Sequence, residues 1–353
     1  MPIAKLVARF QRSAAPYILL AVAAFLLVAI LIPALLVDRT PTTPIGHPNG
    51  AVSGSGDQAV PNTKVQGPVI PVYRTGAGQI EQVPLEVYVR NVVASEMPAD
   101  FELEALKAQA LAARTYIVKR LLEHDYSEVP VAGALVTDTV AHQAYKSEDE
   151  LRRTWGEADY PAKIAKLNRA VNETSNQVIL YKGEPILAAF FSTSNGYTEN
   201  SEDYWTTYIP YLRSVPSPWD QQLSPKFEQT VSLKAQDVMK TLGLPAAVPA
   251  TTGNAGMRVM ATSAGHRIKK LQIGGKSFTG REVREKLGLA SSQFLWKVKG
   301  TDIEITTFGY GHGVGMSQWG ANGMAKAGYD AAAIVKHYYQ GVELGQASSI
   351  LPK

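Results

Sequence analysis

The longest uninterrupted hydrophobic stretch of the chain lies close to its N-terminus. Residues 14–37 read AAPYILLAVAAFLLVAILIPALLV and contain no charged side chain. A helix needs about 20 apolar residues to cross the hydrocarbon layer of a membrane. No polar face marks this stretch as a buried helix of a soluble domain. The pattern therefore predicts a single N-terminal transmembrane helix over residues 14–37.

The charges that flank this stretch predict its orientation. Lys5, Arg9 and Arg12 precede it, whereas Asp38 and Arg39 cancel each other after it. By the positive-inside rule, residues 1–13 form a cytoplasmic tail and the rest of the chain lies outside. A cleaved signal peptide is the alternative, but its apolar core is shorter, about 7–15 residues, and ends at small residues.

Two periodic segments follow a polar linker. Residues 38–75 are rich in Pro, Gly, Thr and Ser, which predicts a flexible linker. Apolar residues then recur at helical spacing, which predicts a helix that breaks at Ser95–Pro98, before a proline. A second helix is predicted from about Asp100, as its N-cap, to Leu122. The apolar face of the first helix consists of Leu85, Tyr88, Val89, Val92 and Val93.

The rest of the chain mixes short strands and helices. A hairpin is predicted with strands over 178–181 and 186–191, and a smaller α/β sub-region over about 229–307. A glycine-rich segment and a helix near 331–339 follow. We therefore expect an α+β fold, in which the transmembrane helix precedes a mixed helix/strand extracytoplasmic domain, residues 76–345, with a substrate cleft.

Composition excludes several classes of function. The chain has 353 residues and a net charge of +4, without a long block of Lys or Arg, so we expect no nucleic-acid partner. It has no cysteine, which excludes disulfides and thiolate chemistry. Its six histidines are scattered, without the pairing typical of a zinc site. We expect neither a metal nor another cofactor.

Glu96 is the first candidate for chemistry. It lies in the break between the two predicted helices, next to Met97 and Pro98. Apolar surroundings disfavour the charged form of a carboxyl group and raise its pKa. A carboxyl with a raised pKa is suited to act as a general acid near neutral pH. The alternative is that Glu96 merely caps the second helix or lies in solvent.

Arg114, on the second predicted helix, is a candidate ligand for polar substrate groups. Its position beside the apolar face suggests that it is partly buried and paired. A guanidinium group binds carboxylates and other oxygen acceptors with a fixed fork of donors. A structural ion pair is the alternative interpretation of the same position.

Two polar segments could line a cleft. The loop 192–200 carries hydroxyl and amide groups suited to sugars, although it could be an ordinary turn. In the second segment, glycines alternate at 309, 311, 313 and 315, which indicates close backbone approach or positive φ. It matches neither a phosphate loop nor a dinucleotide fingerprint, and a tightly packed turn is its alternative. The candidate substrate-binding residues are Ser192, Ser194, Asn195, Tyr197, His312, Gln318 and Trp319.

Several motifs together resemble the stage II sporulation protein D family. The likeness runs from about Val83 to Gly341, with the motifs in the family's order. The matching segments are Ala94–Pro98, Glu104–Ala110 with Ala112–Tyr116, Phe191–Thr198 with Glu202-Asp203, and Gly311–Ala321.

The resemblance implies a peptidoglycan lytic transglycosylase that acts in spore formation. Such an enzyme cuts glycan strands between N-acetylmuramic acid and N-acetylglucosamine and leaves a 1,6-anhydro end. The family's catalytic glutamate falls on Glu96. Its implied substrate is strands stripped of stem peptides, and its implied partners are stage II sporulation proteins P, an amidase, and M, a membrane scaffold. The implied location is the membrane of the forespore septum, during septal thinning and engulfment.

The chain departs from the family at one point, and two other functions remain open. Some family members hold zinc with Cys and His, whereas this chain keeps His142 and has no cysteine. A two-carboxyl hydrolase would draw its second carboxyl from Glu202 or Asp203. A membrane-tethered, non-catalytic scaffold that binds peptidoglycan would use the same anchor and glycine-rich wall.

Overall fold

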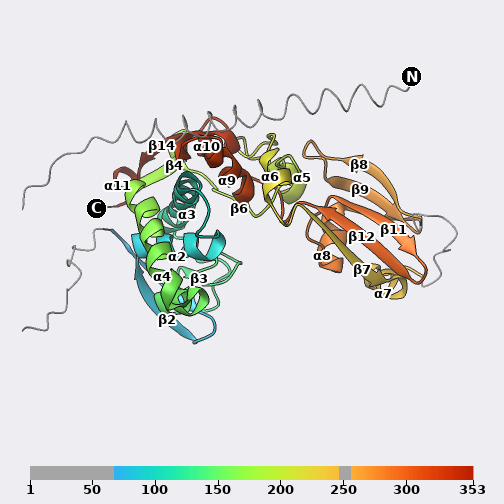
Figure 1. The fold of residues 1–353 in the computed structure, drawn as a ribbon, viewed down its shortest axis with the longest axis horizontal. Helices are drawn as coiled ribbons and strands as arrows, with labels where there is room; N and C mark the ends of the chain where they lie inside the picture. The colour runs from blue at the N-terminus through green and yellow to red at the C-terminus, as the bar shows by residue number, and fades with distance from the viewer. Residues whose placement is uncertain (1–66, 246–255, 353) are drawn as a thin grey trace, which may run out of the picture. The chain divides into compact units, whose positions relative to one another are not determined.

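The computed structural model describes residues 67–245 and 256–352 (Figure 1). The predicted anchor at 14–37 and most of the predicted linker lie outside these residues. Within the described ranges, no helix is both long and apolar enough to span a membrane. Helices and short strands alternate along the chain, which confirms the mixed α and β class.

The larger hydrophobic core is built mainly by helices. The helix α3 (Leu103–Glu123) packs against α2 (Leu85–Glu96), against α4 (Glu148–Glu173) and against α9 (Gln318–Lys326). Alanines on α3 are fully buried and allow these close approaches. The other helices of this part are α5 (Ser201–Trp205), α6 (Trp219–Leu223), α10 (Ala331–Tyr338) and α11 (Ala347–Ile350).

Small sheets border this core. One has the order β2-β1-β3 and another the order β14-β4-β5. The third is a parallel pair of two-residue strands, β6 and β13. Their bounds are β1 (Val69–Arg74), β2 (Gln79–Pro84), β3 (Val136–Thr137), β4 (Gln177–Tyr181), β5 (Glu184–Pro185), β6 (Phe190–Phe191), β13 (Met316–Ser317) and β14 (Glu343–Gln346).

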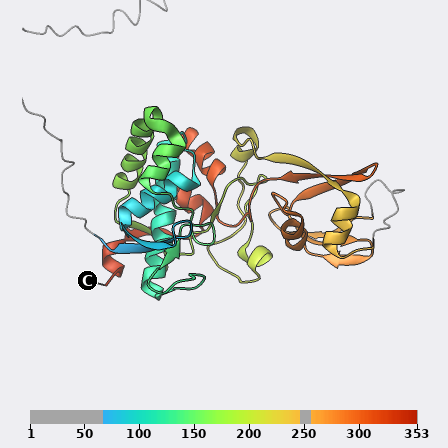
Figure 2. The ribbon, with the colours of Figure 1, turned by 90° about the horizontal axis from the view of Figure 1, so that it is seen from below.

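A second hydrophobic core is formed by elements between residues 228 and 308. Two three-stranded sheets, in the orders β11-β12-β7 and β10-β9-β8, enclose it with α7 (Ala235–Leu242) and α8 (Gly280–Leu287). Figure 2 shows these orange and yellow elements grouped apart from the cyan and green helices. The strands are β7 (Glu228–Lys234), β8 (Arg258–Thr262), β9 (Ile268–Ile273), β10 (Lys276–Phe278), β11 (Phe294–Lys299) and β12 (Asp302–Phe308).

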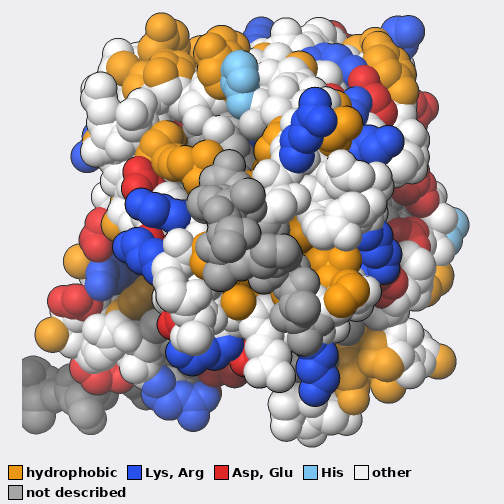
Figure 3. All heavy atoms as spheres, turned by 90° about the vertical axis from the view of Figure 1, so that its right-hand side faces the viewer, with side chains coloured by type: hydrophobic (Ala, Val, Ile, Leu, Met, Phe, Trp, Pro, Cys, Tyr) orange, Lys and Arg blue, Asp and Glu red, His pale blue; other side chains and the backbone are white. Residues whose placement is uncertain are grey.

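The face of the molecule formed by the elements around the second core has no large patch in which all charged side chains have the same sign. Figure 3 shows apolar side chains interspersed with basic and acidic ones there. Leu295, on β11, and Met260, on β8, are exposed apolar side chains on the strands around the second core. The interspersed charge agrees with the even distribution of Lys and Arg in the sequence.

Two predicted elements differ from the structure, and one helix of the structure was not predicted. The predicted cap Asp100 is wrong, because the N–H of Phe101 donates to the C=O of Pro98 and α3 begins only after Glu102. The predicted strand 186–191 is divided, since β4 pairs with Glu184–Pro185, whereas Phe190–Phe191 pairs with β13. The long helix α4, to which the sequence pattern assigned no element, contains Pro161 and a non-helical Gly156.

Candidate active site

The parallel pair β6 and β13 brings two of the predicted motifs together. Phe190 lies opposite Met316, and Phe191 opposite Ser317. The C-terminal ends of parallel strands lie at one edge, so Ser192 and Gln318 leave the pair on the same side. The backbone N–H of Trp319 donates to the C=O of Ser192 at 3.1 Å. Residues more than 120 positions apart therefore form one continuous site.

The alternating glycines make this pairing possible. Gly309, Gly311, Gly313 and Gly315 all have positive φ, between 79° and 114°, as the spacing predicted. A Cβ on Gly315 would lie 2.0 Å from the carbonyl oxygen of Ala189. The close approach is therefore made by the protein's own backbone, in a tightly packed turn that sets the position of Gln318.

Glu96 is the last residue of α2 and is half-buried. Its Oε1 accepts a hydrogen bond from the backbone N–H of Ala144 at 2.8 Å. Burial raises the pKa of the Glu96 carboxyl, and the hydrogen bond from Ala144 opposes that rise without cancelling it. The next residue, Met97, is buried and leaves the helix in an extended conformation. The carboxyl is thus partly desolvated and held by the N–H of Ala144.

The N-terminus of α9 packs against the segment that follows Glu96. Ser317 caps this helix, because its Oγ accepts from the N–H of Gly320. The ring of Trp319 meets Phe101 edge-on, with centroids 4.7 Å apart. The N–H of Glu102 donates to the Asn322 side chain at 2.8 Å. Of the predicted site residues, Trp319 packs on the segment that follows Glu96, and its backbone contacts Ser192.

Ser194 lies on the buried side of its loop. Its N–H donates to Asp220 at 2.7 Å, and its hydroxyl donates to the C=O of Ser217 at 3.1 Å. Asp220 also accepts from the hydroxyls of Ser217 and Ser317, and burial raises the pKa of its carboxyl. Ser194 therefore ties its loop to β13 and α6. The sequence analysis did not identify Asp220. The only local signal there is that this acidic residue follows a tryptophan, Trp219.

Asn195 and Tyr197 contact the second core. The Asn195 amide donates to the C=O of Gly265 at 2.8 Å, and its oxygen accepts from Arg267 at 3.3 Å. The Tyr197 ring meets His266 edge-on at 4.6 Å and stays 39% exposed. The turn 263–267 of the second core thus rests on the loop of the first. Part of the Tyr197 ring is therefore exposed to solvent, whereas the Asn195 side chain is hydrogen-bonded within the protein.

His312 lies in a cluster of aromatic rings. The centroids of Phe191, Tyr204 and Trp205 lie 5.4–5.7 Å from its imidazole. Its Nδ1 accepts from the N–H of Val314. Burial lowers the pKa of His312 to about 3, with a further contribution from Arg267. The imidazole is therefore neutral at physiological pH and packs with aromatic residues.

Arg114 forms a structural ion pair. Its side chain is completely buried, and it binds Glu86 through Nε, 3.0 Å from Oε1, and Nη2, 2.6 Å from Oε2. The C=O groups of Val171 and Gln177 accept its other hydrogens. Glu86 lies ten residues before Glu96 on one helix, about 15 Å away. The structure therefore does not bring Arg114 to Glu96, and its donors are used within the protein.

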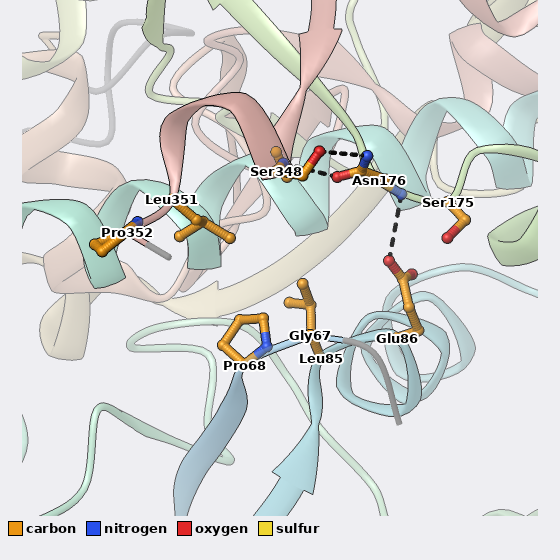
Figure 4. Close-up of a pocket in the computed structure, with 10 residues that line it drawn as sticks. Gly67, Pro68, Leu85, Glu86, Ser175, Asn176, Ser348, Leu351 and Pro352 are labelled. Atoms are coloured by element: carbon orange, nitrogen blue, oxygen red, sulfur yellow. Dashed lines mark hydrogen bonds between the residues drawn. The ribbon is translucent and has the colours of Figure 1, made fainter. Parts of the chain in front are cut away.

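A cavity of about 530 Å³ lies beside this ion pair (Figure 4). Glu86 lines it together with Asn176 and Ser348, and Leu85 and Leu351 supply apolar surface. Asn176 bonds Ser348 across one side of the cavity. The cavity lies at the N-terminal end of α2, away from Glu96, so it is not part of the candidate active site.

The acidic residues considered for a two-carboxyl mechanism are in ion pairs. Arg213 binds Glu202 at 2.7 Å and lowers the pKa of that carboxyl to about 2. Lys269 binds Asp203 at 2.5 Å. A buried acid that sequence reasoning missed is Glu199, whose pKa is raised by burial and whose oxygens accept from Ser263 and Gly265.

His142 contacts hydroxyl and carbonyl oxygens. Its Nδ1 lies 2.9 Å from Thr137 Oγ1, and its Nε2 lies 3.2 Å from the carbonyl oxygen of Ser127. Within residues 67–245 and 256–352, no group of three His, Cys, Asp or Glu side chains is placed to hold a metal ion. Through its contacts with Thr137 and Ser127, His142 instead stabilises the loop whose Ala144 N–H donates to Glu96.

Comparison with known proteins gives the family. A family model described as "Stage II sporulation protein" matches residues 73–181, which include α2, Glu96 and α3. Stage II sporulation protein D of Bacillus amyloliquefaciens is 47% identical over 90% of this chain and 89% of its own length. The protein of that name from Bacillus subtilis strain 168 is 49% identical over 80% of this chain and 81% of its own length. The chain belongs to the stage II sporulation protein D family.

A more distant relative is similar to this chain over part of its own length. The "Amidase enhancer" of Bacillus subtilis strain 168 is 30% identical over 72% of this chain but only 40% of its own length. Membership of the stage II sporulation protein D family confirms the resemblance inferred from the motifs. It identifies the chain as a sporulation protein.

Proposed function

We propose that this protein is a peptidoglycan lytic transglycosylase with Glu96 as its general acid and base. Its substrate is the glycan strand stripped of stem peptides, cut between N-acetylmuramic acid and N-acetylglucosamine. One observation carries the proposal: a half-buried carboxyl with a raised pKa is held by a backbone N–H at the end of α2, and the segment that follows it packs against α9. Family membership supports a role in the cell wall during sporulation.

The reaction needs one carboxyl group because it needs no external water. Glu96, protonated at the start, donates its proton to the glycosidic oxygen as the bond to C1 breaks. The carboxylate then accepts the proton of the muramic acid C6 hydroxyl while that oxygen bonds to C1. The attack is intramolecular, so it gains from proximity. The products are a 1,6-anhydro end and a free hydroxyl on the leaving sugar, and Glu96 is protonated again.

The donors around Glu96 suit this cycle. The acid step requires the protonated form, which burial favours. The N–H of Ala144 stabilises the carboxylate that forms between the two proton transfers. We assign Arg114 a structural part in this mechanism, since its donors are occupied by Glu86 and backbone carbonyls. The exposed face of Tyr197 and the half-buried Trp319 remain available to stack on sugars.

We also propose the cellular setting that the family resemblance implies. Residues 14–37 anchor the protein in the membrane of the forespore septum, with the domain outside the cytoplasm. Stage II sporulation proteins P and M are its partners in septal thinning and engulfment. In sporulating cells, a tagged chain that lacks residues 14–37 would be lost from the membrane fraction, and retention there would contradict the anchor.

Product analysis tests the proposed activity. Purified protein is incubated with peptide-stripped glycan, and the fragments are weighed by mass spectrometry. We expect anhydro ends from the wild type and from the control Glu102→Gln, which changes an exposed acid on the same segment. Glu96→Gln should bind glycan and cut about 10²–10⁴-fold more slowly. Reducing ends would indicate a hydrolase, and binding without cutting by the wild type would indicate a scaffold.

A further inference from the structure

Arg267 is a buried cation with two nitrogen donors to which the described residues offer no acceptor. It directly precedes β9, and only 2% of it is exposed. Its Nη1 donates to the side-chain oxygen of Asn195 at 3.3 Å and to the C=O of Tyr197 at 3.4 Å. Its Nε and Nη2 have no hydrogen-bond partner among the described residues. Burial lowers the pKa of Arg267 to about 10, so the guanidinium is still charged at neutral pH.

The two donors without a partner form one edge of the guanidinium. Arg114 uses the same pair of atoms, Nε and Nη2, to bind both oxygens of the Glu86 carboxylate. This edge matches the spacing of the two oxygens of a carboxylate or phosphate. A buried charge is costly unless it is paired, and the contacts of Arg267 are to an amide and a carbonyl oxygen.

The glycine-rich segment makes room for this side chain. A Cβ on Gly313 would lie 2.4 Å from Cζ of Arg267, so only glycine permits the guanidinium to lie there. The same guanidinium lies 5.9 Å from the centroid of the Phe191 ring. Gly313 therefore accommodates a cation, whereas Gly315 accommodates a neighbouring backbone.

A pocket of about 320 Å³ is lined by Arg267. Its volume is within the range of small-molecule sites, roughly 300–1,000 Å³. Lys269 and Arg281 add basic side chains to its lining. Thr279, which also lines it, caps the N-terminus of α8 by accepting from the N–H of Glu282. The positive end of the helix dipole adds to the attraction for an anion.

The two carboxyl groups that line the pocket have other partners. Asp203 pairs with Lys269. Glu199 accepts from the Ser263 hydroxyl and from the N–H of Gly265. Burial raises the pKa of Glu199, which favours its neutral form. The pocket thus has an available guanidinium edge and basic neighbours.

We propose that this pocket binds an oxyanion, a carboxylate or a phosphate, with Arg267 as its main ligand. Nε and Nη2 donate to two oxygens of the bound group, and Lys269 and Arg281 attract it by charge. The binding supplies the buried cation with a counter-charge.

The proposed function, on which this step rests, identifies the oxyanion as the lactyl carboxylate of N-acetylmuramic acid. A stem peptide is joined to the glycan by an amide at this carboxyl, so an intact strand has no charge there. Removal of the peptide frees one carboxylate on each muramic acid. Binding at Arg267 then favours stripped strands over intact ones. A phosphate ester of another wall polymer is the other source of the same chemistry.

Arginine NMR tests the site without any cleavage. The full-length chain is labelled with nitrogen-15 in its arginines, and the Nε–H signal of Arg267, assigned with Arg267→Met, is followed as sodium acetate or sodium phosphate is added. Sodium chloride at equal ionic strength is the control for screening. We expect a saturable shift with acetate and with phosphate, and none with chloride. A signal that neither oxyanion moves, or that chloride moves equally, would overturn the site.

Two forms of stripped glycan identify the source of the oxyanion. Fragments with free lactyl carboxylates are compared with the same fragments after conversion of these carboxyls to methyl amides. We expect the free form to bind about tenfold more tightly, because hydrogen bonds to a charged group are lost in the amide. Arg267→Met should remove this difference. Equal affinity of the two forms would overturn the muramic acid assignment, and a shift of Arg267 with phosphate would then assign the pocket to a phosphate ester.

Further variants keep the test decisive. If Arg267→Met does not fold, Arg267→Lys assigns the signal and Lys269→Gln, at a half-exposed position, should weaken acetate binding. Arg258→Gln, which removes an exposed arginine of β8 outside the pocket, is the matched control and should leave the affinity unchanged. An equal loss in Arg258→Gln would overturn a local site. If the wild type cuts no glycan, the proposed function fails, yet the acetate and phosphate titrations still decide whether Arg267 binds an oxyanion.

Discussion

Glu96 and Ala144 are 48 residues apart and are joined by a hydrogen bond of 2.8 Å from backbone N–H to carboxylate. A backbone donor cannot swing away as a side chain can, so the carboxyl is held by the loop itself. That loop is in turn fixed, since the C=O of Asp138 accepts from the N–H of Tyr145, and Asp138 binds Arg74. The geometry of the acid therefore depends on β1 and on the loop as much as on α2.

The pH dependence of activity should follow the titration of Glu96. Because burial raises its pKa, the protonated acid persists to higher pH than for an exposed glutamate. We expect kcat/KM on stripped glycan to be lost as pH rises through that raised pKa. A pH–rate profile of the wild type measures this fall in kcat/KM. A fall at the pKa of an ordinary exposed glutamate would contradict a shielded acid.

Removing Glu86 should destabilise the protein strongly. Glu86→Gln leaves the fully buried Arg114 without its counter-ion, and breaking such a pair typically costs about 3–5 kcal/mol. Because the Glu86 side chain is 30% exposed, we expect the lower end of this range. Urea unfolding measures the loss. The double variant Glu86→Gln with Arg114→Met should lose less than the sum of the two single changes, and simple additivity would show that the residues act independently.

Gly315→Ala should separate β13 from β6. The added Cβ would meet the C=O of Ala189 at 2.0 Å, in addition to the strain of a positive φ. We expect both stability and glycan cleavage to fall. Gly328→Ala is the matched control, because its φ is also positive but open space surrounds the new Cβ, so it should cost about 1–2 kcal/mol. Equal unfolding free energies for the two variants would argue against the close approach.

Glu199 should make stability depend on pH. Its carboxyl has a raised pKa in the folded protein, so the folded state binds its proton more tightly than the unfolded chain does. This contribution to stability is complete below the unfolded pKa and is lost as pH rises through the folded pKa. Urea unfolding at several pH values should show a smaller decline for Glu199→Gln than for the wild type, and an identical decline would contradict the prediction. Glu184→Gln, which changes an exposed residue of β5, is the control.

The helices nearest the site could be predicted from sequence because their signals are local. Apolar spacing identified α2, and Pro98 marked the break that leaves Glu96 at its end. The helix α10 lies where the apolar spacing predicted a helix, near 331–339. Local signals failed for α4, where Gly156 and Pro161 interrupt a polar sequence.

The arrangement of the site depended on contacts that no local pattern contains. The pairing of β6 with β13 joins segments more than 120 residues apart, and a two-residue strand has no periodicity to read. Arg114 was correctly placed beside an apolar face, but its partner is chosen by the packing of α2 on α3. Likewise, the glycine alternation showed that something approaches closely, but not that it is Ala189.

The source of the oxygen at the new sugar end tests the central claim most directly. Purified protein is incubated with peptide-stripped glycan in water enriched in oxygen-18, and the fragments are weighed by mass spectrometry. If Glu96 alone directs attack by the sugar's own C6 hydroxyl, the new ends are anhydro ends without the heavy isotope, and Glu96→Gln forms almost none. Reducing ends that carry oxygen-18, or anhydro ends formed at the wild-type rate by Glu96→Gln, would contradict the account.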